Sequence, residues 1–218
     1  MPILSTSKLY RDFKDIDKDA YHTIIRFYEA KAKNIPELPF DLYFDVLVDY
    51  ANALFEVGAY EKHLLAADEV VALSIAHNIQ FYEGEDIYFK NLYQKAASHY
   101  NRLEYDEAIH ILKELIKIAP HHGLSILFLK KCMNQSQPTY IKMTRASSII
   151  LFLGAAIITA IEVMVIHPFS PTYTTMFEQL RLSTLGLGIL VLLGTFLYHR
   201  YQMNHQVNAF VKKIRRTK

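Results

Sequence analysis

Residues Ala146–Ile166 read ASSIILFLGAAIITAIEVMVI, and residues Leu182–Tyr198 read LSTLGLGILVLLGTFLY. The first segment contains a single charged residue, Glu162, and the second contains none. A helix rises about 1.5 Å per residue, so the first segment covers roughly 30 Å, the thickness of a hydrocarbon core, and the second is at the short end of the spanning range. The pattern predicts two transmembrane helices, 146–166 and 182–198. The alternative is a pair of buried core helices, but such helices usually keep a polar stripe that neither segment has.

The charges around these segments predict their orientation. The connecting residues 167–181 contain two prolines and are too short for a domain, so we expect a helical hairpin with an external loop. Basic residues gather on the other side of the spans, at Lys130, Lys131, Lys142, Arg145, Arg200, Lys212, Lys213, Arg215, Arg216 and Lys218, whereas the loop offers only Arg181. Cytoplasmic segments carry the excess of Lys and Arg. We therefore expect an integral membrane protein with two spans and cytoplasmic N- and C-termini, most simply in a bacterial inner membrane.

The charge balance also divides the chain into two parts. Residues 1–145 hold 17 Lys and Arg against 20 Asp and Glu, a net charge of −3, whereas residues 146–218 hold 7 against 2, a net charge of +5. The low glycine and proline content excludes a collagen-like or a disordered linker protein. The lone cysteine, Cys132, excludes a disulfide framework and is expected to be a packed apolar residue.

The first part repeats itself at an offset of 45 residues, with helical rather than alternating spacing of its apolar residues. The matched pairs are Tyr43 with Tyr88, Phe44 with Phe89, Leu47 with Leu92, Ala51 with Ala96, Tyr60 with Tyr105 and Glu69 with Glu114. An internal period of this length is typical of a helical solenoid, in which helix pairs stack because no pair can bury its apolar face alone.

Each unit resembles a tetratricopeptide repeat (TPR). The second unit carries Leu92, Ala96 and Tyr100 on a first helix, then the turn Leu103–Ala108, and closes with Pro120. The first unit has the same turn at Gly58–Glu61, but His63 replaces the usual small residue there, while Tyr21, Tyr28 and Pro36 suggest a leading half-repeat. Because the period exceeds the family's usual value of about 34, the connection 78–86 or the helices must be longer.

The resemblance and the two apolar segments together predict an all-α fold, a short TPR-like α-solenoid followed by a two-helix transmembrane hairpin. The expected domains are a cytoplasmic TPR-like helical domain, a linker, the first span, an external loop, the second span and a basic cytoplasmic tail, at 1–135, 136–145, 146–166, 167–181, 182–198 and 199–218 respectively. We expect Gly123–Met133 to form a capping helix of the solenoid.

By the same resemblance, the first helices line a concave groove that binds a protein or peptide partner. The groove positions are Asp45, Asp49, Asn52, Phe55, Lys90, Tyr93, Gln94, Tyr100 and Asn101. Aromatic, amide and charged side chains together suit an extended peptide or a partner helix. The alternative is that the aromatic residues pack against the leading helix and leave no open groove. Val48 stands where chaperone-binding members place the first clamp lysine, which argues against that specificity.

Two further features concern the membrane. The basic tail favours contact with anionic lipid headgroups through Arg200, Lys212, Lys213, Arg215 and Arg216 rather than nucleic-acid binding. Glu162, the intramembrane polar residue, is either a proton or ion ligand or an interfacial glutamate that reaches the headgroups or hydrogen-bonds a neighbouring helix. Small residues at Ala156, Ala160, Thr184 and Gly188 would let the two spans approach closely.

Catalytic and metal-binding patterns are weak. His121 and His122 in a loop, and Glu107, His110 and Glu114 on one helix, lack convincing third and fourth ligands. Without a catalytic motif, we expect no enzyme, no cofactor and no metal. The sequence favours a membrane-anchored TPR-like adaptor or scaffold that binds a protein partner at the cytoplasmic membrane face. The alternative is an accessory subunit of a transport, secretion or energy-converting membrane complex, with other subunits as partners.

Overall fold

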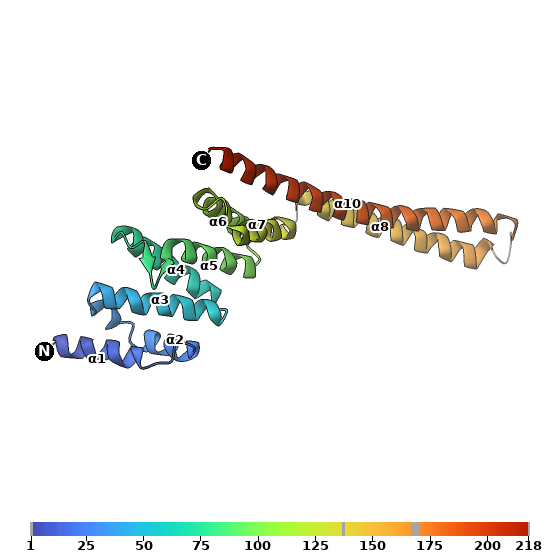
Figure 1. The fold of residues 1–218 in the computed structure, drawn as a ribbon. Coiled ribbons are helices and arrows are strands. Elements are labelled where there is room, and N and C mark those ends of the chain that lie inside the picture. The colour runs from blue at the N-terminus through green and yellow to red at the C-terminus, as the bar shows by residue number, and fades with distance from the viewer. Residues whose placement is uncertain (1, 137, 167–170, 218) are drawn as a thin grey trace. The chain divides into compact units, whose positions relative to one another are not determined.

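The computed structural model describes residues 2–136, 138–166 and 171–217 (Figure 1). The chain divides into two compact units. The first unit, called here the solenoid, comprises Met1–Cys132 with Lys213–Lys218, and the second unit, the hairpin, comprises Met133–Lys212.

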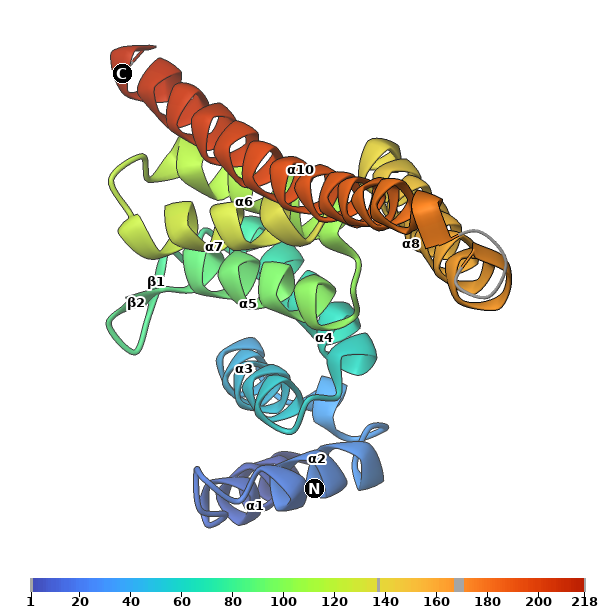
Figure 2. The ribbon, with the colours of Figure 1, turned by 90° about the vertical axis from the view of Figure 1, so that its right-hand side faces the viewer.

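The solenoid is built of helices, and those between residues 21 and 118 pack each on the next along the chain. Its helices are α1 (Pro2–Lys14), α2 (Tyr21–Ala30), the short 3-10 helix η1 (Ile35–Glu37), α3 (Phe40–Glu56), α4 (Tyr60–Ala76), α5 (Ile87–Asn101), α6 (Tyr105–Ile118) and α7 (Gly123–Gln135). Figure 2 shows these helices as successive layers from the N-terminal pair upward. The predicted TPR-like helical repeat is therefore confirmed.

Small and apolar residues form the core between the layers. Ala51 and Ala96, the paired small residues of the two repeats, are 1% and 0% exposed, which lets neighbouring helices approach closely. One core cluster joins α3, α4 and the start of α5 through Phe44, Leu47, Val48, Ala51, Leu54, Ala66, Val70 and Ile87. A second joins α1, α2 and α3 through Phe13, Ile24, Ile35, Leu38, Val46 and Ala53. The expected leading half-repeat is thus a complete helix pair, α1 and α2, that shares a core with the first repeat.

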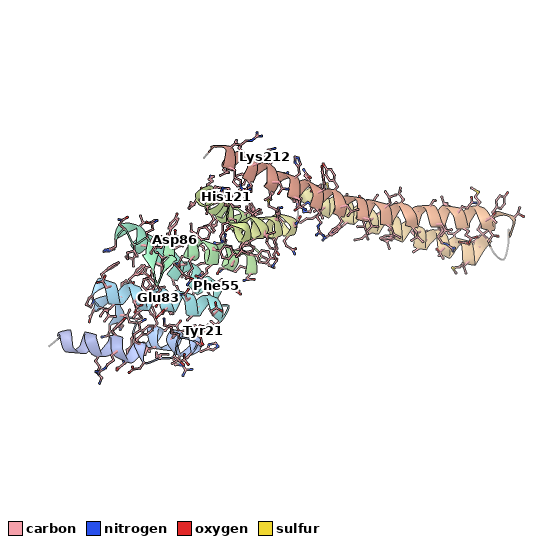
Figure 3. All side chains as sticks on the ribbon, viewed as in Figure 1. Tyr21, Phe55, Glu83, Asp86, His121 and Lys212 are labelled. Atoms are coloured by element: carbon pink, nitrogen blue, oxygen red, sulfur yellow. The ribbon has the colours of Figure 1, made fainter. Side chains whose placement is uncertain are left out.

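The connection between α4 and α5 contains a β-hairpin that explains the long repeat period. Strands β1 (Phe81–Tyr82) and β2 (Glu85–Asp86) pair antiparallel. Glu83 and Gly84 turn the chain with φ values of 49° and 83°, as a two-residue hairpin turn of type I′ requires. Figure 3 labels Glu83 and Asp86 on this connection. Asp86 also caps α5, because its Oδ1 accepts a hydrogen bond of 2.8 Å from the Phe89 backbone amide.

The hairpin unit consists mainly of two long apolar helices. α8 (Thr139–Ile161) continues into the π-helical turn η2 (Glu162–Ile166), and the 3-10 helix η3 (Pro171–Tyr173) leads into α10 (Thr174–Thr217). Tyr140–Ile166 and Thr174–Arg216 are long and apolar enough to cross a membrane, by length and composition. The predicted spans lie inside these segments, but the second helix begins within the stretch expected as loop and continues through the tail. The first residues of that loop, 167–170, lie outside the described residues.

One small residue brings α8 and α10 together. A Cβ atom added at Gly188 would lie 2.8 Å from the ring of Phe152, so glycine is what admits this ring. On α8, Ala155 is buried at 2% exposure, whereas Ala156 and Ala160 are exposed. The expectation that Gly188 lets the helices approach is confirmed. The same expectation for Ala156 and Ala160 is wrong, because both are exposed and the buried alanine of α8 is Ala155.

Candidate partner-binding surface and membrane residues

The predicted groove residues lie on α3 and α5, and none of the nine is fully buried. Asp45, Asp49 and Asn52 follow one another at spacings of four and three residues, which places them on one face of α3. Val48, which lies between them in sequence, is 4% exposed and belongs to the core, so it is not a groove residue.

The N-terminal end of this surface is acidic and contacts α1. Lys14 Nζ lies 2.6 Å from Asp45 Oδ2 and 2.9 Å from Asp49 Oδ2. The hydroxyl of Tyr10 donates to Asp45 Oδ2 at 2.7 Å, and the hydroxyl of Tyr82 donates to the other oxygen. Desolvation lowers the pKa of Lys14, but its hydrogen bonds to the two carboxylates hold that pKa above its ordinary value. Burial raises the pKa of Asp49. Two carboxylates therefore share one ammonium, leaving a net negative charge.

The middle of the surface is an amide pair that joins the two repeats. Gln94 Nε2 on α5 donates to Asn52 Oδ1 on α3 over 3.1 Å. Gln94 Oε1 is buried and has no hydrogen-bond partner within the described residues. A buried acceptor of this kind is costly unless a donor reaches it.

The C-terminal end is aromatic and contacts α7. Tyr93 and Tyr100 on α5 pack against Phe128, with ring centroids 5.6 Å and 5.5 Å apart. Lys131 Nζ lies 4.7 Å from the centroid of the Tyr100 ring, in a cation–π contact. Sequence reasoning missed Phe128 and Lys131 because α7 was treated only as a cap. Their spacing of three residues, which places both on one helix face, was the available signal.

The remaining groove residues lie at the margins. Phe55 packs against Tyr60 and His63 of the same repeat, with centroid distances of 6.2 Å and 5.2 Å, and Figure 3 labels it. Lys90 pairs with Glu85 of the β-hairpin at 2.5 Å. Asn101 is exposed at the end of α5.

His63, at the position of the family's small residue, is fully buried between the repeats. Its Nδ1 is 2.8 Å from the hydroxyl of Ser98 on α5, and its Nε2 has no partner among the described residues. Burial lowers the pKa of His63 to about 4, so the ring is neutral at pH 7. The ring therefore joins the two repeats through its hydrogen bond to Ser98 as well as through its burial.

Glu162 pairs with Arg181 inside the hairpin. Arg181 Nη1 donates to Glu162 Oε2 at 3.1 Å, and the glutamate is 5% exposed. Of the two sequence hypotheses, this contact favours the glutamate that bonds a neighbouring helix.

The basic residues of the tail are on the surface of α10. Arg200, Lys212, Lys213, Arg215 and Arg216 are exposed. Arg215 Nε donates to the backbone oxygen of Pro120 over 3.0 Å, so that side chain already has a partner in the solenoid unit.

Other reactive groups are scattered. Within the described ranges, no three His, Cys, Asp or Glu residues are placed to hold a metal ion. Cys132 is fully buried, as expected of a packed residue, and burial raises the pKa of its thiol to about 12.

Known proteins offer a limited comparison. No protein-family model and no curated protein matches the sequence. Two crystal structures of the nearly identical TPR-like repeats of a candidate kinesin light chain from Podosopora anserina are similar in structure. The first is 14% identical, with a TM-score of 0.42 over 99% of this chain and 96% of that one. The second, a variant of the same repeats with one glutamine replaced by methionine, is 15% identical, with a TM-score of 0.41 over 98% and 96%.

Proposed function

We propose that this protein is a membrane-anchored adaptor whose TPR-like solenoid binds a protein partner at the cytoplasmic face of a membrane. The observation that carries the proposal is a set of partly exposed side chains on α1, α3, α5 and α7. This set, called here the ladder, comprises Lys14, Asp45, Asp49, Asn52, Gln94, Tyr93, Tyr100 and Lys131. Carboxylates mark one end, an amide pair the middle, and tyrosines with a lysine the other end. Such a surface offers both charge and aromatic contacts to a peptide.

The polarity of the ladder predicts the chemistry of the partner. A basic side chain of the partner would face Asp45 and Asp49, which share one lysine as ion-pair partner among the described residues. An acidic or aromatic side chain would face Tyr100 and Lys131. We therefore favour a partner segment with separated basic and acidic groups.

The two apolar helices supply the anchor. Within the 18-residue apolar stretch of each helix, 11% of the first stretch and 6% of the second are buried. Large side chains such as Leu153, Ile157 and Leu190 are 60%, 61% and 68% exposed, which suits contact with lipid better than contact with water. An anchor of this kind raises the effective concentration of a bound partner at the membrane. The basic flanks favour cytoplasmic termini.

The Glu162–Arg181 pair favours an anchor over a subunit of a larger membrane complex. An unpaired intramembrane carboxylate would call for a charge on another chain. Here Arg181 of the same hairpin already supplies that charge.

Site-specific photo-crosslinking in native membranes tests the adaptor function. A benzophenone amino acid replaces Tyr93 or Tyr100 in the full-length protein, since both changes keep an aromatic ring on the ladder. We expect one discrete protein adduct from each position. The matched control replaces Phe81, an aromatic residue of the β-hairpin that is 63% exposed, and should not give that adduct.

A second variant separates specific binding from proximity. Lys131→Glu reverses the charge beside Tyr100 and should weaken the Tyr100 adduct about tenfold, as expected for one lost charge-assisted contact. Lys62→Glu reverses a charge that pairs with Glu29 on α2 and serves as its control. Identical adducts from the ladder and Phe81 positions, insensitive to Lys131→Glu, would contradict the adaptor function.

A further inference from the structure

The hairpin unit contains a cavity of about 480 Å³ near the cytoplasmic ends of the two predicted spans. α8 contributes Ile141 and Arg145, and α10 contributes Leu193, Phe196, His199 and Arg200. The cavity therefore lies where the hydrocarbon core meets the headgroup layer, if the hairpin spans a bilayer as proposed.

One wall of the cavity is apolar and open to the surroundings. Leu193 and Phe196 line it and are 57% and 59% exposed. Both lie inside the predicted span 182–198, so their exposed surface would face acyl chains of the cytoplasmic leaflet. This wall suits a hydrocarbon chain.

The opposite end of the cavity is cationic. Arg145 and Arg200 line it just beyond the last residues of the predicted spans, at headgroup depth. No carboxylate is among its described lining residues. Arginine forms bidentate hydrogen bonds with phosphate and keeps its charge at every physiological pH. This end suits a phosphate ester and disfavours an added ammonium group.

Two residues of the lining also carry a buried polar atom that has no partner among the described residues. His199 lines it, is 5% exposed, and has an Nε2 atom without a hydrogen-bond partner in the described chain. Its Nδ1 is 2.7 Å from the hydroxyl of Tyr140. The same hydroxyl also lies 3.5 Å from Gln202 Oε1. When it donates to the nearer Nδ1, the ring proton is on Nε2, which can then donate to an anion. Asn134 also lines the cavity, and its Oδ1 is a buried acceptor without a partner in the same described ranges.

We infer that this cavity binds one anionic glycerophospholipid of the cytoplasmic leaflet. Arg145, Arg200 and His199 hold the phosphate, a headgroup hydroxyl donates to Asn134 Oδ1, and one acyl chain runs along Leu193 and Phe196. This site is distinct from the diffuse attraction of the basic tail, because it is a cavity with both polar and apolar walls. It rests on the proposed membrane anchoring.

Native mass spectrometry of the delipidated full-length protein in detergent tests the inference. Phosphatidylglycerol is compared with phosphatidylcholine of identical chains. We expect one phosphatidylglycerol to bind at least about tenfold more tightly than phosphatidylcholine, because the described lining has two cations and no carboxylate. Equal affinity for both lipids would overturn the inference.

Paired charge variants locate the site. Arg145→Gln with Arg200→Gln should lower phosphatidylglycerol binding by about tenfold or more. The control, Lys212→Gln with Arg216→Gln, removes the same charge from exposed positions outside the lining and should leave the first bound lipid unchanged. If the control lowers binding as much, the attraction is diffuse and the site does not exist.

Two further comparisons test whether the ligand is a lipid or a free phosphate ester, and whether His199 contributes a hydrogen-bond donor. Glycerol phosphate has the headgroup without chains, so binding as tight as that of the lipid would reduce the site to an anion site and overturn the lipid assignment. Phe196→Ala should weaken the lipid but not glycerol phosphate. His199→Gln keeps a donor and should retain more lipid than His199→Leu, with helical content checked by circular dichroism.

The lipid result and the proposed adaptor function fail separately. Loss of lipid selectivity with an intact Tyr100 adduct would reject only the cavity. Release of the protein from membranes by alkaline carbonate would reject the anchored adaptor, whatever the lipid assay shows.

Discussion

A single buried histidine stands where TPR sequences usually place a small residue. His63 fills the space between α4 and α5 and bonds Ser98. The family pattern identified the departure at this position but could not supply its reason. The structure supplies it, because a larger side chain at this position needs a polar partner on the next repeat.

This histidine predicts a pH-dependent stability of the solenoid. Its pKa is about 4 when folded and about 6.5 when unfolded, so the unfolded state binds more protons between those values. Stability is therefore fully present above about pH 6.5 and is lost as the pH falls toward 4, by about 2 kcal/mol between pH 7 and pH 5. Urea unfolding of the full-length protein, followed by circular dichroism, measures this loss.

Variants assign the pH effect to the residue. His63→Ala restores the family's small residue, should flatten the dependence between pH 7 and pH 5, and should cost about 2–3 kcal/mol at pH 7 through the cavity and the lost hydrogen bond. His110→Ala, at an exposed position, should change neither quantity. An unaltered pH dependence in His63→Ala would assign it to other groups.

At the scale of the element, one glycine sets the contact between the two apolar helices. Gly188→Leu should destabilise the hairpin by about 1–3 kcal/mol, because its Cβ would enter the ring of Phe152. Gly186→Leu is the matched control, since nothing in the described structure lies within 4 Å of a Cβ added there. Thermal unfolding in detergent micelles compares the two. Equal midpoints would show that α8 and α10 do not meet at Gly188.

The helices and strands also differ in how well the sequence predicts them. Long helices with strong periodicity, and the two long apolar helices, were predictable because each repeats its signal over many residues. The β-hairpin was not, because strands of two residues are too short for an alternating pattern and Glu83-Gly84 is not one of the usual type I′ turn sequences. The sequence did not indicate that α10 begins at Thr174, because the residues between Thr174 and Arg181 are polar enough to resemble a loop.

The candidate site was predictable by position rather than by contact. Repeat register placed Asp45 and Tyr100 on the surface of their helices, and the structure leaves both partly exposed. The repeat register could not show that Lys14 pairs with Asp45 or that Phe128 packs against Tyr100, because these contacts join elements far apart in sequence. Tertiary contacts of this kind have no local signal.

At the scale of the whole molecule, the proposed topology predicts which segments face which compartment. Epitope tags at the N-terminus, at the C-terminus and after Tyr173 should divide into two accessible tags on the cytoplasmic side and one on the other side, since basic residues flank the spans. Antibody binding to sealed vesicles of known orientation measures this. Three tags accessible from one side would mean that the hairpin does not cross the bilayer.

The buried thiol of Cys132 resists disulfide formation and thiol-directed alkylation while the protein is folded. With a pKa of about 12, about one thiol in 10⁵ is ionised at pH 7, and only the ionised form attacks. Copies crowded together on a bilayer would therefore not become joined through sulfur. The rate at which a maleimide modifies Cys132 would instead measure how often the C-terminal turn of α7 opens transiently.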